Sequence, residues 1–379
     1  MLKKVNRPHM PSWFDLECAK WFRDNFSHQE FKRFMEAKNG MIETAKLNGI
    51  PVDDVNHYWY KGKNYSIHAK TKDVDFKELT KGLIEQIKNN APKFDKIKRK
   101  KMDDPVMFCI SPTDPHFGKL ARAIQTGDKY NLKKAKQKFM EGINGLMELT
   151  DNFNIEQIVL VGGNDVLHVD GSANTTTKGT RQDVTGMFYD SFNVAFNTYK
   201  ECLQMLMQIC DVTYIHVMSN HDYHSGWYLS KVLDAYFSDC ENITFNTSPA
   251  DRKYLFYGAN LIGFSHGDGA RDSELIDLMK RECKSTWSKC RFGYWYLGHL
   301  HHHIRKENNK IKSKDHADVM IIKDSKKIQS DMINVQYLRS ISGTDAWHFK
   351  QGYGGQPKGI EGFIHHPIDG QIARFTKFV

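Results

Sequence analysis

Short apolar runs alternate with longer amphipathic stretches over the last three quarters of the chain. Five of these runs predict buried β-strands, at residues 106–110, 155–162, 212–218, 261–264 and 294–297. Stretches with apolar residues at helical spacing separate several of them, at residues 131–150, 184–209, 227–239 and 272–284. The tail, residues 332–379, is expected to be rich in β-strand and to end in a hairpin around Asp369 and Gly370. Strands that alternate with helices predict a layered α/β domain.

The first quarter of the chain has a different pattern. Amphipathic helices are predicted at residues 12–26, 29–48 and 75–90, and a short β-hairpin is predicted at residues 58–67. The spacing of Ala45, Gly49 and Val55 fits a helix-turn-helix, although plain packing of two helices explains it as well. The second helix of this candidate helix-turn-helix would carry Asp53 and Asp54, and their negative charges argue against a surface that contacts phosphates.

A charged run from Lys96 to Pro105 predicts a linker between two domains. We therefore expect a mainly helical accessory domain over residues 1–104 and a second domain over residues 105–379. The first carries 22 basic and 15 acidic side chains, a net charge of +7 out of +9 for the whole chain. Such a basic domain indicates an anionic polymer as partner, nucleic acid ahead of membrane, with a solvated lysine-rich surface as the alternative.

Composition excludes several classes of protein. Mean hydropathy is −0.59, and no apolar run reaches the ~18 residues of a membrane-spanning helix. The first residues lack the apolar stretch of a secretory signal. The seven cysteines are odd in number and form no Cys-x-x-Cys pair, which argues against a disulfide framework and against a cysteine zinc site. We expect reduced thiols and a cytoplasmic location.

Polar residues follow each of the five predicted strands of the second domain. The motifs are Asp114-Pro115-His116, Gly163-Asn164-Asp165, Asn220-His221-Asp222, His266-Gly267 and Gly298-His299-Leu300-His301. Loops beyond the carboxyl ends of the strands converge on one crevice in an open α/β sheet, so these side chains should meet. Oxygen and nitrogen ligands without thiolate suit Mn, Fe or Zn better than an all-oxygen Ca or Mg site.

The order of these five motifs resembles the calcineurin-like metallophosphoesterases, a family of binuclear metal phosphoesterases that includes repair exonucleases. The motifs extend over residues 114–301, about half of the chain. The resemblance implies a layered metallophosphoesterase fold of β-sheets flanked by helices. It also implies two divalent metal ions as cofactors, with Mn expected first and Fe or Zn as alternatives.

The resemblance further implies a role for each motif residue. One ion would be held by Asp114, His116 and His301, the other by Asn220, His266 and His299, and Asp165 would bridge them. His299 and His301, two residues apart on a strand, would face the same way. A hydroxide between the ions would attack the phosphate in line. His221 would be the general acid, with Asp222 orienting its imidazole.

Two positions depart from the family pattern. Ser219 and Asn164 stand where the family usually has glycine, before Asn220-His221 and before the bridging Asp165. Both changes are expected to affect backbone freedom and not the ligands themselves.

Further side chains are candidates for substrate contact, each with a solvated loop or a packing role as the alternative: His168, Lys178, Arg181, His224, Trp347 and Tyr353. Together these features predict a two-metal phosphodiesterase or nuclease acting on DNA or RNA. The alternatives are a phosphomonoesterase acting on phosphoprotein or nucleotide, and an inactive nucleic-acid-binding scaffold. The presence of His221 counts against a scaffold, which needs no proton donor.

Overall fold

The computed structural model describes residues 91–300, 333–352 and 355–379, the strands at 57–61, 66–70, 304–307 and 310–312, and the single positions 27, 29 and 32. The chain divides into two compact units, residues 1–83 and 84–379. In the smaller unit, β1 (His57–Lys61) and β2 (Ser66–Lys70) form the predicted antiparallel hairpin, with Lys61 opposite Ser66. The helix-turn-helix at Ala45, Gly49 and Val55 lies outside the described residues, as do the predicted N-terminal helices apart from isolated positions.

The charged run before Pro105 is attached to the larger unit, whereas the sequence predicts a domain boundary near residue 104. The main-chain N–H of Ile97 donates to Asn242 Oδ1 at 2.8 Å, and Asn242 Nδ2 donates back to the Ile97 carbonyl at 2.9 Å. Arg99 Nε donates to Asp211 Oδ1 at 3.1 Å. Residues 97–99 therefore lie along the edge of the larger unit, and the division between the units falls earlier, at residue 83.

Two six-stranded mixed sheets form the larger unit. The first has the order β14-β13-β3-β4-β5-β6 and the second the order β11-β10-β12-β9-β8-β7. The first sheet consists of β3 (Val106–Ser111), β4 (Ile155–Gly163), β5 (Asp211–Val217), β6 (Ile243–Asn246), β13 (Gly359–His366) and β14 (Gly370–Phe378). The second consists of β7 (Lys253–Tyr257), β8 (Asn260–Ser265), β9 (Phe292–Leu297), β10 (Ile304–Glu307), β11 (Lys310–Lys312) and β12 (Ile333–Tyr337).

The centre of each sheet is parallel, so the carboxyl ends of its strands lie at one edge. β3, β4, β5 and β6 are parallel to one another, as are β8, β9 and β12. The predicted strands of the second domain are all present, and the C-terminal hairpin of β13 and β14 is also confirmed.

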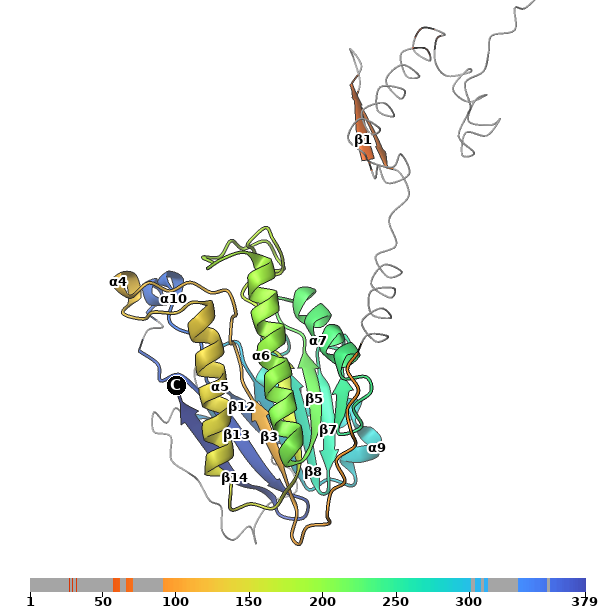
Figure 1. Ribbon diagram of the computed structural model, residues 1–379, viewed down its shortest axis with the longest axis vertical. Helices are drawn as coiled ribbons and strands as arrows, with labels where there is room; N and C mark the ends of the chain where they lie inside the picture. Colours follow the sequence, from red (N-terminus) through yellow and green to blue (C-terminus); the bar gives the residue numbers. More distant parts are fainter. Residues whose placement is uncertain are drawn as a thin grey trace, which may run out of the picture. The chain divides into compact units, whose positions relative to one another are not determined.

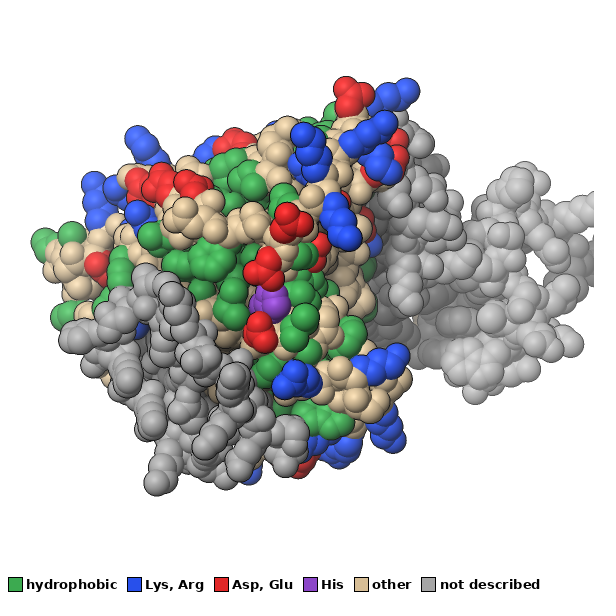
Figure 2. Space-filling model, turned by 90° about the horizontal axis from the view of Figure 1, so that it is seen from below, with side chains coloured by type: hydrophobic (Ala, Val, Ile, Leu, Met, Phe, Trp, Pro, Cys, Tyr) green, Lys and Arg blue, Asp and Glu red, His purple; other side chains and the backbone are tan. Residues whose placement is uncertain are grey.

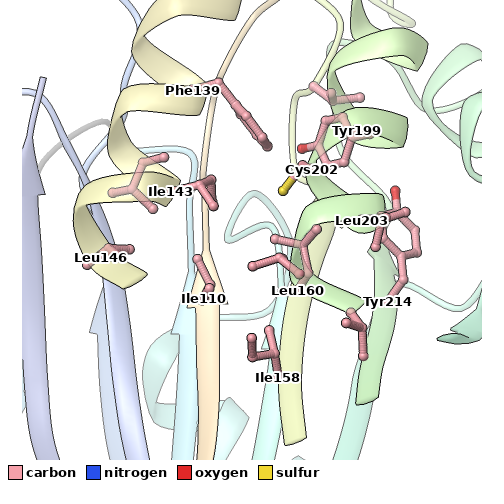
Figure 3. Packing of buried hydrophobic residues seen from close by; sticks show 14 of the residues in the cluster. Ile110, Phe139, Ile143, Leu146, Ile158, Leu160, Tyr199, Cys202, Leu203 and Tyr214 are labelled. Carbon is pink, nitrogen blue, oxygen red and sulfur yellow. The ribbon is translucent and has the colours of Figure 1, made fainter. Parts of the chain in front are cut away.

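Helices cover the outer face of the first sheet (Figure 1). These are α5 (Leu132–Leu149), α6 (Phe188–Ile209) and α7 (Ser225–Tyr236). Figure 3 shows how Phe139 and Ile143 from α5 and Tyr199 and Leu203 from α6 point toward Leu160 and its neighbours on the strands. This core packs α6 against β3, β4 and β5. The helix begins at the top of Figure 1, beside the loop that follows β4.

A second apolar core lies between the two sheets, because it combines Val159 and Ile215 of the first sheet with Ile262 and Tyr296 of the second. A third joins the second sheet to α8 (Asp272–Glu282) through Leu275 and Met279. The larger unit is therefore layered in the order helix, sheet, sheet, helix, which confirms the predicted layered α/β class. The shorter helices are α4 (Ala123–Thr126), α9 (Lys284–Trp287) and α10 (Ala346–Lys350).

The cysteines of the described part are all free thiols, five of them buried. Burial raises the pKa of Cys210 to about 12, so this thiol stays protonated and inert at neutral pH. Within the described residues, every helix is too short or too polar to cross a bilayer.

Candidate metal centre

The site is built from loops at the carboxyl ends of strands in both sheets. The loops after β3, β4 and β5 are joined by main-chain hydrogen bonds, from Asp114 N to the Asn164 carbonyl at 2.9 Å and from Asn164 N to the Val217 carbonyl at 3.0 Å. The loop after β9 in the other sheet is tied in by His299 N, which donates to Asp114 Oδ1 at 3.2 Å. The predicted convergence of these loops is therefore present, but it spans two sheets.

The backbone of the site is locally strained. Five of the seven non-glycine residues with positive φ in the described part belong to the predicted motifs: Asp114 (51°), His116 (46°), Asn164 (58°), Asp165 (60°) and His299 (67°). The left-handed region costs an L-residue about 1–2 kcal/mol, and such strain concentrates at functional sites. His299 lies beyond the end of β9, in a bend, so the expectation that it sits on a strand is wrong.

One group of donor atoms surrounds the Nε2 atom of His266. That atom lies 2.8 Å from Asn220 Oδ1, 3.2 Å from Asp165 Oδ2 and 3.2 Å from His299 Nδ1. The carboxylate and amide oxygens only accept hydrogen bonds, and each neutral imidazole nitrogen without a proton presents a lone pair. Four electron-pair donors at such distances fit a cation between them, and the set could hold a metal ion.

A second group shares the Asp165 carboxylate. Ligand atoms of Asp114, His116 and Asp165 lie within 4.8 Å of one another, and His116 Nε2 is 3.9 Å from Asp165 Oδ2. All three side chains are buried, at 1% exposure or less. Asp165 therefore contributes to both groups, which is the position that a bridging ligand needs. His301 lies outside the described residues.

Buried groups of opposite charge face one another in the centre. Burial alone would lower the pKa of His266, but the facing Asp165 and Asp114 charges raise it to about 9. Burial would likewise raise the pKa of Asp165, yet the His266 and His221 charges and their hydrogen bonds hold it below its usual value. Burial and the Asp165 charge raise the pKa of Asp114 to about 7. The arrangement therefore favours positive charge among the nitrogen donors, opposite the Asp165 carboxylate.

His221 is brought to the rim of this centre. Its main-chain N–H donates to Asp165 Oδ1 at 2.9 Å, and its ring lies 4.6 Å from the His116 ring, centroid to centroid. The ring Nδ1 lies 2.8 Å from the main-chain oxygen of His168. A carbonyl oxygen only accepts, so Nδ1 carries the hydrogen and Nε2 is the atom available for proton transfer.

Asp222 is placed differently from the sequence-based expectation. Its carboxylate accepts from Ser219 Oγ at 2.6 Å and from the main-chain N–H of Leu167 at 2.8 Å. Burial and the nearby Asp165 charge raise its pKa to about 8. The carboxylate thus holds the loop after β4, while the His168 carbonyl orients the His221 ring.

Of the substrate candidates, His168 joins the centre most directly. Its Nδ1 lies 3.3 Å from His116 Nδ1, and the ligand atoms of His116, His168 and His221 form a third cluster that could hold a metal ion. Burial, followed by the Lys119 charge, lowers the pKa of His168 well below its ordinary value. A neutral imidazole is therefore kept beside His116.

The other candidates lie farther out in the loops. Lys178 and Arg181 are exposed. Lys178 follows Thr177, whose main-chain N–H donates to the Asn220 carbonyl at 3.3 Å. His224 Nδ1 pairs with Asp170 Oδ2 at 2.8 Å. Trp347, on α10, is exposed, and Tyr353 lies outside the described residues.

Three further residues support the site that sequence reasoning did not single out as functional. Asn164 Oδ1 lies 2.7 Å from His266 Nδ1. Ser219 Oγ accepts from Asp165 N at 2.7 Å. Lys119, fully buried, pairs with Asp345 Oδ2 at 2.9 Å. Asn164 and Ser219 could have been found from the sequence, because they depart from the family pattern. Lys119 could not, because its partner Asp345 is more than 200 residues away in the chain.

Comparison of the chain with known protein-family models and with curated protein sequences gives no match.

Proposed function

We propose that this protein is a calcineurin-like, two-metal phosphoesterase that cleaves phosphodiester bonds in a polynucleotide. The observation that carries the proposal is the Asp165 carboxylate, which is shared by two groups of donors. Asn220, His266 and His299 would hold one divalent ion, and Asp114 and His116 would hold the other. The ordered motifs of the sequence support the same assignment.

When bound, two divalent ions would activate a water as nucleophile and neutralise charge on the phosphate oxygens. The protein's own contribution is orientation and proton transfer. With Nδ1–H held by the His168 carbonyl, His221 leaves Nε2 for catalysis. The imidazolium form, with a second hydrogen on Nε2, would donate that proton to the leaving oxygen and become neutral imidazole. The His221 N–H donates to the shared carboxylate, and the Asp165 N–H donates to Ser219 Oγ, so both the side chain and the backbone of Asp165 are held close to His221.

The polynucleotide part of the proposal is supported by charge. Residues 1–104 hold a net +7, and Lys98, Lys100 and Lys101 are exposed. Lys96 and Arg99 in the same run form ion pairs with Glu241 and Asp211 of the larger unit. On the face of the larger unit seen in Figure 2, basic side chains are scattered among acidic ones. The N-terminal region is therefore the better candidate for phosphate contacts.

The test is hydrolysis with and without metal. The protein, stripped by a chelator and reloaded with Mn²⁺, is incubated with single-stranded DNA, duplex DNA, RNA, a cyclic nucleotide and a phosphopeptide. We expect metal-dependent cleavage of a nucleic acid and binding of two ions per chain by calorimetry. Asp165→Asn should weaken both ions, and Asp277→Asn, an exposed carboxylate on α8, should change neither.

Full activity in excess chelator would refute the metal chemistry. Metal-dependent hydrolysis of the phosphopeptide alone would keep that chemistry and refute the polynucleotide substrate. Binding of nucleic acid with no hydrolysis under any metal would indicate a scaffold.

A further inference from the structure

We propose that Asn164 is a positioning residue, which selects the tautomer and orientation of His266 so that its Nε2 faces the metal ions. This inference rests on the proposed two-metal function. It concerns a residue that occupies a glycine position of the family pattern, so the motif itself assigns no role to its side chain.

The first step is the hydrogen bond between the two side chains. Asn164 Oδ1 lies 2.7 Å from His266 Nδ1, and both residues are 1% exposed. Both ring nitrogens face acceptor oxygens, since Nε2 lies 2.8 Å from Asn220 Oδ1 and 3.2 Å from Asp165 Oδ2. A metal ion bound among these donors would take the Nε2 lone pair, and the hydrogen of the neutral ring would then reside on Nδ1, where Asn164 Oδ1 can accept it. A metal-binding histidine needs this kind of support on its other nitrogen.

The second step is that the backbone does not require a side chain at this position. Asn164 has a φ of 58°, which glycine adopts at less cost than any L-residue. Its main-chain bonds to Val217 and Asp114 use only the N–H and carbonyl groups, which glycine also has. The carboxamide is therefore accounted for by what it contacts, namely His266.

The third step is the space that the fold reserves for the carboxamide. A Cβ atom at Gly298 would lie 2.6 Å from Asn164 Oδ1 and 3.1 Å from its Cγ. The loop after β9 thus carries a glycine where the Asn164 side chain crosses from the first sheet to the second. This contact couples the position of the carboxamide to the loop that also supplies His299.

The test compares Asn164→Gly with Asn164→Asp, each titrated with Mn²⁺ by calorimetry. Asn164→Gly keeps the favourable backbone but removes the acceptor, and we expect one of the two ions to bind about 10–100-fold more weakly. Asn164→Asp keeps an acceptor and tolerates positive φ, so its affinity should match or exceed that of the unaltered protein. Asn174→Gly is the matched control, because Asn174 also has positive φ (56°) and its side chain contacts none of the proposed ligands.

A second readout follows the proton directly. In the Zn²⁺-loaded protein, long-range proton–nitrogen NMR should detect a protected proton on His266 Nδ1. The proton should exchange faster in Asn164→Gly and remain protected in Asn164→Asp and Asn174→Gly. These two measurements do not depend on turnover, and a role limited to backbone conformation would leave the His266 Nδ1 proton protected in Asn164→Gly.

The outcomes separate the two proposals. If the unaltered protein binds no metal, the proposed function fails. If it binds two ions and Asn164→Gly binds both with unchanged affinity and an unchanged Nδ1 proton, only the positioning role of Asn164 fails. Equal weakening in Asn164→Gly and Asn174→Gly would also overturn that role, because the cause would then be general loop flexibility.

Discussion

The main-chain oxygen of His168 lies 2.8 Å from Nδ1 of His221, so one histidine of the site orients the ring of another through its backbone. The His221 side chain therefore needs no carboxylate to fix its tautomer. Since only the His221 main-chain N–H, and not its ring, contacts Asp165, the side chain can be replaced without removing that bond.

His221→Asn should accordingly keep both metal ions but lose proton transfer. We expect the hydrolysis of a phosphodiester with an alkoxide leaving group to fall by about 10²–10⁴-fold, the usual contribution of general acid catalysis. A nitrophenolate leaves without a proton, so its ester should be affected much less. Rates on both esters, with metal content measured in parallel, decide the matter. Equal losses on the two substrates would rule out the proton-donor role.

Gly298→Ala should disturb the centre without touching a ligand. Its Cβ would meet Asn164 Oδ1 at 2.6 Å, and the carboxamide would have to move away from His266. We expect about 10–100-fold weaker binding of one ion, with a loss of folding free energy of about 1–3 kcal/mol from the added methyl group. Gly269→Ala is the control, because nothing lies within 4 Å of a Cβ there. Unchanged Mn²⁺ titrations of Gly298→Ala would contradict this prediction.

The buried ion pair between Lys119 and Asp345 should stabilise the fold at neutral pH. Burial would raise the pKa of Asp345, but its hydrogen bond with His348 and the charge of Lys119 hold the pKa below its ordinary value of 3.8. Asp345→Asn leaves the Lys119 ammonium buried without its counter-ion, at a cost of about 3–5 kcal/mol.

Because the folded-state pKa of Asp345 is lowered, its stabilising contribution is present above the unfolded-state pKa and is lost as pH falls through the folded-state value. The difference in unfolding free energy between the protein and Asp345→Asn should thus be constant from about pH 5 to 8 and shrink below pH 3.8. Urea unfolding across this range is the measurement. A difference that grows on acidification would contradict the assignment.

Removal of the N-terminal region should separate polymer binding from chemistry. A chain starting at residue 91 keeps the bonds of Ile97 and Arg99 to the larger unit, so it should unfold at nearly the same urea concentration. A chain starting at residue 105 leaves the buried Asn242 side chain short of partners and should lose about 1–3 kcal/mol.

The chain starting at residue 91 also tests the nucleic-acid contacts. Log affinity for duplex DNA should fall with log salt at a slope of about −0.9 per phosphate contact, and the chain starting at residue 91 should show a flatter slope. Hydrolysis of a small phosphodiester should persist, because the proposed ligands all lie beyond residue 104. A soluble, active chain starting at residue 91 still carries Lys98, Lys100 and Lys101. An unchanged slope in that chain would show that the basic side chains of residues 1–90 do not contact nucleic acid.

Much of this protein follows from local sequence. Short apolar runs such as 106–110 and 158–161 favour buried strands, and the structure places strands there. The polar residues at the ends of those strands predicted convergence, because parallel strands end at one edge of a sheet. The helix positions could also be predicted, because apolar residues at helical spacing form one face that has to be buried.

What the tertiary structure alone decided concerns pairs of residues that are distant in the chain. The assignment of β3–β5 and β8–β9 to different sheets, the pairing of Lys119 with Asp345, and the contact of Asn164 with His266 depend on which elements pack together. Hydrophobic periodicity encodes which face of a strand or helix is buried, but not the partner that covers it. The sequence thus determined the elements and the polar residues at the strand ends, whereas packing determined which nitrogen of His266 faces Asp165 and Asn220.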